Sequence, residues 1–163
     1  MTPSTPISAS AEPGAPLLTV RDLRIETRDR SPAALIENVS FDIRAGETLA
    51  LVGESGAGKS LSALAILGLL PPDAMRVTGG EIRLGAQSLS DISPRQLRKV
   101  RGGRVAMIFQ DPLGCLNPVL TVGRQITEAL HLHKGLRGAA ARRRAVELLD
   151  LVRIPEAEKR LDE

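Results

Sequence analysis

The sequence predicts an α/β fold built on a mostly parallel sheet, for three reasons. Residues 48–52 (TLALV) and 105–109 (VAMIF) are wholly apolar runs, which are typical of strands buried on both faces of a parallel sheet. The first run leads into a glycine-rich loop at residues 53–60 (GESGAGKS). An apolar segment long enough for a buried helix follows at residues 59–70. A strand, a tight loop and a helix in this order indicate an α/β unit.

The segments before the loop predict a tail and two strands. Residues 1–16 are rich in Pro, Ser, Thr and Ala, and we expect a disordered tail there. Residues 17–27 and 34–43 alternate in part between apolar and polar side chains, which favours strands. The turn between them is marked by Ser31 and Pro32. We therefore place the beginning of the ordered domain near residue 17.

The segments after the loop predict helices joined by short breaks. Pro71 and Pro72 are expected to end the helix at 59–70, because proline cannot donate to the helical ladder. Residues 78–85 predict another strand. A short basic helix is expected to begin at Pro94, with Ser93 as its N-cap. Two further helices are predicted at residues 121–134 and 139–152, the second with an apolar stripe formed by Val146, Leu149 and Val152.

Composition limits the functions that can be expected. The 163 residues carry a net charge of +3, and only 1% of them are aromatic. The single cysteine, Cys115, excludes an internal disulfide and a cysteine-based zinc cluster. His131 and His133 point to different sides of a helix, so we expect surface residues there rather than metal ligands. No signal peptide is recognised, and the longest apolar run is too short to span a bilayer.

The basic residues form two groups that could be taken for a nucleic-acid surface. No aromatic residues are interleaved with them and the net charge is small, so we expect solvated helix faces and no nucleic acid. The groups are Arg95, Arg98, Lys99, Arg101 and Arg104, and separately Arg142, Arg143 and Arg144.

The glycine-rich loop carries the clearest chemistry. It fits the pattern G-x-x-x-x-G-K-S and has a predicted strand before it and a predicted helix after it. Its glycines let successive N–H groups point inward around an anion, and the start of the helix adds further N–H donors. We expect Lys59 to reach the outer phosphates of a nucleotide and Ser60 to ligate Mg²⁺. The predicted phosphate-binding residues are Gly53, Glu54, Ser55, Gly56, Ala57, Gly58, Lys59 and Ser60.

Gln110 is a second candidate, because it follows the apolar run at residues 105–109. Its neutral amide could offer oxygen to Mg²⁺ or water without adding negative charge beside a polyphosphate. A simple strand-end cap explains the residue equally well from its chemistry alone.

Three stretches together resemble the ATP-binding subunit of ABC transporters, and most of all the dipeptide, oligopeptide and nickel importers. They are VSFDIRAGETLALVGESGAGKS, MIFQDP and LNPVLTVGRQI, and the resemblance extends from about residue 17 to the end. It implies that residues 53–60 are the Walker A loop that binds Mg-ATP. It also implies that Gln110 is the Q-loop glutamine, a catalytic residue that touches Mg²⁺ and the attacking water.

The resemblance also implies an architecture and partners. The strands before Gly46, together with residues 78–84, correspond to an antiparallel β subdomain, and a helical subdomain begins at about residue 121. Residues 111–122 correspond to the surface that contacts the transmembrane permease subunits. A second ATP-binding subunit completes each nucleotide site. The expected location is the cytoplasmic face of a bacterial inner membrane, peripheral and held there through the permease.

Two positions depart from the family pattern. Thr27 stands where relatives place an aromatic residue that stacks on adenine, so we expect weaker and less base-selective nucleotide binding. Arg28 could replace the ring in part by laying its guanidinium on the base. Cys115 stands where serine is more usual, and we interpret it as a small apolar filler.

The 163 residues contain no LSGGQ-like signature, no Walker B strand ending in Asp-Glu and no switch histidine. We therefore interpret the chain as a family domain whose C-terminal part is missing, which does not hydrolyse ATP efficiently alone. Apolar runs left without neighbouring strands would make it prone to aggregate. Two alternatives stay open: a self-contained P-loop kinase or GTPase that uses Asp111 as its acid, and a non-catalytic nucleotide-binding module.

Overall fold

The computed structural model describes residues 15–109, 114 and 116–163. These residues belong to two compact units, one ending at Lys99 and the other running from Val100 to Glu163. Most of the predicted tail lies outside the described residues, and so do Gln110, Asp111 and Cys115. The predictions made for those residues therefore stay predictions.

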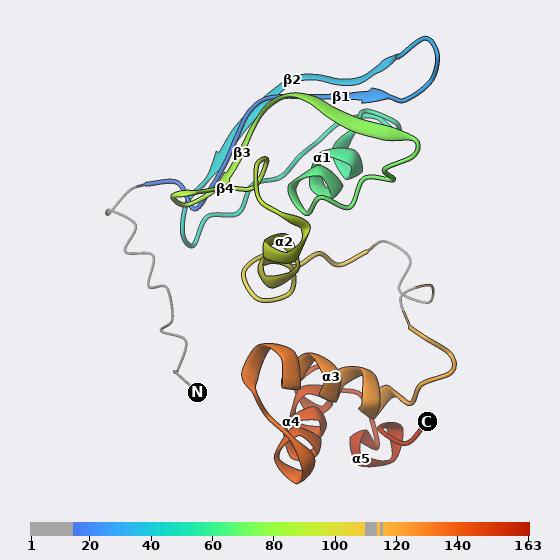
Figure 1. The fold of residues 1–163 in the computed structure, drawn as a ribbon. Helices are drawn as coiled ribbons and strands as arrows, with labels where there is room; N and C mark the ends of the chain where they lie inside the picture. Colours follow the sequence, from blue (N-terminus) through green and yellow to red (C-terminus); the bar gives the residue numbers. More distant parts are fainter. Residues whose placement is uncertain (1–14, 110–113, 115) are drawn as a thin grey trace. The chain divides into compact units, whose positions relative to one another are not determined.

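The first unit contains a four-stranded antiparallel sheet in the order β2-β1-β3-β4 (Figure 1). The strands predicted at residues 17–27, 34–43 and 78–85 are confirmed as β1, β2 and β3, with β3 beginning three residues earlier than predicted. This sheet agrees with the antiparallel β subdomain that the resemblance implies. The bounds are β1 Leu18–Thr27, β2 Ala34–Ile43, β3 Met75–Leu84 and β4 Gln87–Ser88.

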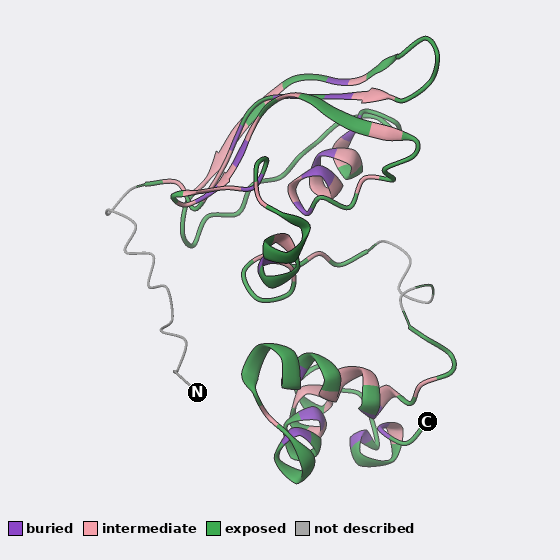
Figure 2. Cartoon of the chain, viewed as in Figure 1, coloured by how far each residue is buried: buried purple, intermediate pink, exposed green. Residues whose placement is uncertain are grey.

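A bulge at Asp22 explains why β1 alternates only in part. Val20 pairs with Phe41, whereas Leu23 pairs with Val39, so three steps along β1 match two steps along β2. Asp22 absorbs the extra residue with a left-handed backbone, φ 46°. The bulge returns Leu23 to the buried face, where it joins Val20 and Ile25 in the core. Figure 2 shows buried, purple stretches alternating with less buried ones along the strands of the sheet.

The two parallel strands predicted from the apolar runs are wrong in this structure. Residues 48–52 and 105–109 form no strand, and Val52 and Ile108 are 93% and 97% exposed. A parallel strand needs hydrogen-bonded neighbours on the sheet, and the described residues supply none for residues 48–52 and no strand beside residues 105–109. The one parallel bridge among the described residues joins Arg101 to Val105. Apolar composition shows which segments are suited to burial, but it does not show whether neighbouring strands are present to pair with them.

The helix after the glycine-rich loop is α1, Lys59–Ile66, and it ends four residues earlier than predicted. Gly68 has a left-handed backbone with φ 60°, and its N–H donates to the Ala65 carbonyl. The N–H of Leu69 reaches back to the Leu64 carbonyl at 2.8 Å. These two bonds form a Schellman motif, so the glycine and not Pro71 ends the helix.

The short helix α2, Pro94–Val100, begins where the sequence predicted. The Ser93 hydroxyl accepts from the Gln96 N–H at 3.4 Å, and the Gln96 side chain accepts from the Ser93 N–H at 3.0 Å. This reciprocal pair is a capping box, which confirms Ser93 as the N-cap.

The described residues of the second unit form three helices, α3 Val122–Lys134, α4 Gly138–Leu151 and α5 Ala157–Arg160. The first two confirm the helices predicted at residues 121–134 and 139–152, whereas α5 was not predicted. Leu130, Ala145 and Leu161 form the core of this unit, and Val146 and Leu149 pack against it. Val152 is 65% exposed, so its predicted place on the buried stripe is wrong. The reason is that Val152 caps α4 and lies outside its last turn.

Candidate functional site

The glycine-rich loop lies directly before α1 and turns tightly at two glycines. Gly56 and Gly58 have φ values of 86° and 80°, in the left-handed region that favours glycine. Gly58 is also buried, and a Cβ there would lie 2.8 Å from Cγ1 of Ile36 on β2. The close approach between the loop and β2 therefore needs glycine at position 58. Ile36 fixes the start of α1 in this way, a role that the strand pattern alone did not indicate.

The Lys59 side chain folds back over the loop. Its Nζ donates to the Gly53 carbonyl at 2.8 Å and to the Glu54 carbonyl at 2.6 Å. The Glu54 carbonyl also accepts from the Ala57 N–H at 3.2 Å. The ammonium group thus ties both ends of the loop together and brings positive charge beside the helix N-terminus.

The N–H groups at the start of α1 are free to bind an anion. Gly58 provides no side-chain cap, and the first turn carries no acidic residue. Among the described residues, no acceptor is found for the N–H groups of Gly58, Lys59 or Ser60. Unpaired N–H groups and the positive end of the helix dipole both favour a phosphate at this position.

The N-terminus of α3 provides a contrast within the same chain. The N–H groups of Val122, Gly123 and Arg124 donate to Glu163 O, Leu161 O and Thr121 Oγ1, at 2.9, 2.8 and 3.2 Å. The donors that an anion would need are therefore taken. Of these two helix starts, α1 is the one suited to phosphate.

The residues at α1 fit the Mg-nucleotide that the sequence predicted. Ser60 lies exposed in the first turn of α1, where a hydroxyl can ligate a cation that phosphate oxygens also bind. No group of three His, Cys, Asp or Glu residues suited to a metal occurs in the described part of the chain. A metal there would need the oxygens of its nucleotide, which is how Mg²⁺ is usually held. Gln110 lies outside the described residues, so its role stays a prediction.

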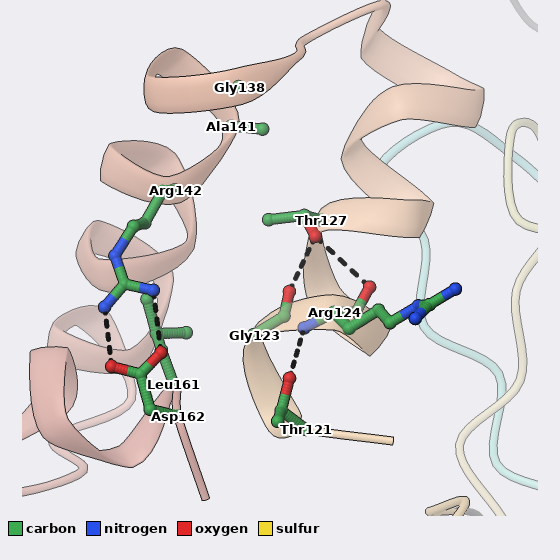
Figure 3. Close-up of a pocket in the computed structure, with 9 residues that line it drawn as sticks. All are labelled: Thr121, Gly123, Arg124, Thr127, Gly138, Ala141, Arg142, Leu161 and Asp162. Carbon is green, nitrogen blue, oxygen red and sulfur yellow. Dashed lines mark hydrogen bonds and ion pairs between the residues drawn. The ribbon is translucent and has the colours of Figure 1, made fainter. Parts of the chain in front are cut away.

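A cavity of about 280 Å³ lies in the second unit, and none of the predicted site residues lines it (Figure 3). Arg142 closes one side of it with two hydrogen bonds to Asp162, at 2.9 and 2.8 Å. These bonds hold the pKa of the Asp162 carboxyl below its usual value. Arg124 points away from Arg142 in Figure 3. Because Arg142 already has its anion in Asp162, its guanidinium is not free to bind an anionic ligand.

Thr27, the position where the family pattern has an aromatic residue, stabilises a turn of the sheet. Its Oγ1 accepts from the Ala33 N–H at 3.0 Å and closes the turn between β1 and β2. Arg28 is held toward β3, since its Nε donates to the Met75 carbonyl at 3.4 Å. Neither side chain offers an aromatic face to a base.

We expect Thr27→Tyr to raise the affinity for ATP. Stacking one base on an aromatic ring contributes roughly 1–3 kcal/mol, which corresponds to about tenfold to hundredfold in affinity. A titration with a fluorescent adenine nucleotide measures the change. Thr27→Val is the matched control, because it removes the hydroxyl bond to Ala33 without adding a ring. Equal affinities for the Tyr and Val variants would contradict a base-stacking role for this position.

The chain matches the family model described as ABC transporter over residues 36–163. A Brucella abortus protein named for peptide import and ATP binding is 49% identical over 150 residues, which are 91% of this chain and 45% of that protein. The oligopeptide transport ATP-binding protein AppD of Bacillus subtilis is 44% identical over 148 residues, 90% of this chain and 45% of AppD. The chain thus spans about 45% of the length of these relatives.

A solved structure shares the fold. The ATP-binding cassette MJ0796, in a dimeric state bound to ADP and phosphate, aligns with a TM-score of 0.71 at 23% identity. The alignment covers 90% of this chain and 60% of the cassette. None of the helices in the described residues is long and apolar enough to cross a bilayer. The chain belongs to the ABC transporter family, and the relatives it matches over this length are ATP-binding proteins of peptide transport.

Proposed function

We propose that this chain provides the phosphate-binding part of the ATP-binding subunit of an ABC importer for peptides or similar small solutes. The observation that carries the proposal is the pair of features at α1, its unpaired N–H groups and the ammonium of Lys59 beside them. The names of the relatives support peptides as the solute class.

The chain's own residues would share the work of holding Mg-ATP. The N–H groups of Gly58, Lys59 and Ser60 would bind phosphate oxygens. Lys59 would contribute charge-assisted hydrogen bonds to the outer phosphates, giving up at least one of its two loop carbonyls. The Ser60 hydroxyl would ligate Mg²⁺, and Gln110 would orient the metal and the attacking water. Magnesium supplies the charge that offsets the polyphosphate.

The proposal includes partners and a limit on turnover. A second ATP-binding subunit and the permease subunits would complete the transporter at the cytoplasmic face of the membrane, with residues 111–122 contacting the permease. The 163 residues contain no signature motif, Walker B acid or switch histidine. We therefore propose that they bind Mg-ATP without turning it over efficiently by themselves.

Calorimetric titration of the purified chain with ATP, ADP and AMP tests the proposal. We expect binding of ATP and ADP that weakens when EDTA removes Mg²⁺. Much weaker binding is expected for AMP, which lacks the outer phosphates that Lys59 and Mg²⁺ reach. ATP binding that equals AMP binding, with no effect of Mg²⁺, would exclude the proposed site.

A further inference from the structure

One side chain, Gln125 of α3, holds the turn at residues 117–120. Its Nε2 donates to the carbonyls of Asn117 and Leu120, at 3.1 and 2.9 Å, and its Oε1 accepts from the Asn117 N–H at 3.0 Å. The partners are main-chain groups with fixed roles, so only one orientation of the amide satisfies all three bonds. Gln125 therefore attaches the turn to the helix that follows it.

The turn also has bonds of its own. The Asn117 side chain accepts from the Val119 N–H at 3.0 Å, and the Leu120 N–H donates to the Asn117 carbonyl at 3.1 Å. Asn at the first position and Pro118 at the second favour this geometry. The local sequence thus shapes the turn, whereas Gln125 determines where it sits on α3.

The turn carries apolar side chains into solvent. Val119 is 85% exposed and Leu116, directly before the turn, is 54% exposed. Both lie within residues 111–122, the segment proposed above to contact the permease. An apolar side chain on a turn that is already held in place binds with a smaller loss of conformational entropy than one on a loose loop.

We propose that Gln125 is a positioning residue for this contact: it fixes the 117–120 turn on α3 so that Val119 and Leu116 are presented in one geometry. The identity of the partner rests on the proposed function, whereas the attachment of the turn does not. Gln125 acts through the turn and does not itself touch the partner.

Amide hydrogen exchange of the chain, followed residue by residue by NMR, tests the attachment. In Gln125→Ala we expect the Asn117 amide to exchange about fivefold to tenfold faster, the factor for one lost hydrogen bond. Gln125→Glu should have a smaller effect, because its carboxylate still accepts from the Asn117 N–H while it repels the carbonyls of Asn117 and Leu120. Thr127→Val is the control. It removes the bonds from the Thr127 hydroxyl to Gly123 O and Arg124 O in the same helix and should leave Asn117 unchanged.

Binding of the same variants to the transporter's purified membrane-spanning subunits tests the presentation. We expect Gln125→Ala to bind about tenfold more weakly with an unchanged melting temperature, and Thr127→Val to bind like the unaltered chain. Unchanged exchange at Asn117, or faster exchange with unchanged binding, would overturn the inference. If the unaltered chain does not bind these subunits, the proposed function fails, whereas the exchange result still decides whether Gln125 fixes the turn.

Discussion

Lys59→Ala is expected to lower the affinity for Mg-ATP by about tenfold to hundredfold, the factor for losing charge-assisted hydrogen bonds to phosphate. Lys59 is the cation that the structure places beside the free N–H groups of α1. The variant also removes both bonds from Nζ to the carbonyls of Gly53 and Glu54, so the empty loop should loosen as well. Calorimetric titration with ATP measures the affinity, and amide exchange at Ala57 reports on the loop.

Lys99→Ala is the matched control for charge. Lys99 is an exposed lysine on α2, and its loss changes the net charge by the same amount as the loss of Lys59. We expect its ATP affinity to stay within about twofold of the unaltered chain, because exposed charges are screened over a Debye length of roughly 10 Å. Equal losses in the two variants would mean that general charge, and not the loop lysine, attracts the nucleotide.

Gly80→Ala is expected to destabilise the sheet by about 2–5 kcal/mol, the sum of left-handed backbone strain and forced overpacking. Gly80 lies in β3 with φ 87°, and a Cβ there would meet backbone atoms of β1, including the Asp22 carbonyl oxygen at 2.5 Å. Backbone atoms cannot move aside without disturbing the pairing of β1 with β3. Urea unfolding followed by far-UV circular dichroism measures the loss, since the chain has no Trp or Tyr for fluorescence.

Gly85→Ala separates the cost of the left-handed backbone from the cost of overpacking. Gly85 also has a left-handed backbone, φ 58°, but an added Cβ would have open space around it. We therefore expect a cost of only about 1 kcal/mol, from the backbone conformation alone. If both alanine variants unfold at the same urea concentration, the close packing of Gly80 against β1 is not what stabilises this part of the sheet.

Residue type and short spacing were sufficient to predict the elements that depend on hydrogen bonds between nearby residues. Ser93 was predicted as an N-cap and caps α2. Thr121, where a helix was predicted to begin, proves to be the N-cap of α3. The strands at residues 17–27 and 34–43 could be predicted from alternation, but the bulge at Asp22 could not. A left-handed aspartate is required by the pairing with β2 and β3, which a single strand does not reveal.

Features that depend on distant residues could not be predicted. The apolar runs at residues 48–52 and 105–109 have strand composition, yet a strand exists only where a neighbour binds it. Gln125 was not recognised either, although Asn117-Pro118 marks a turn and Thr121 marks the helix start. Its role depends on an amide reaching back eight residues to Asn117. Within the glycine-rich loop, the structure brings the carbonyls of Gly53 and Glu54 to Lys59 Nζ, and the phosphate-binding role of residues 53–60 stays a prediction.

If the chain binds nucleotide as proposed, the exposed run before the glycine-rich loop couples that binding to the local order of the backbone. No strand in the described residues pairs with the exposed Val52, which directly precedes the loop. A phosphate that orders the loop would therefore also restrain the backbone at residues 48–52. Part of the free energy of the phosphate contacts would then offset the entropy lost when this stretch becomes ordered. The measured affinity would be weaker than the contacts alone would give. By thermodynamic linkage, saturating nucleotide would make this stretch more resistant to proteolysis. A neighbouring strand from another segment or subunit that ordered the same stretch would raise the affinity for ATP without contacting the nucleotide.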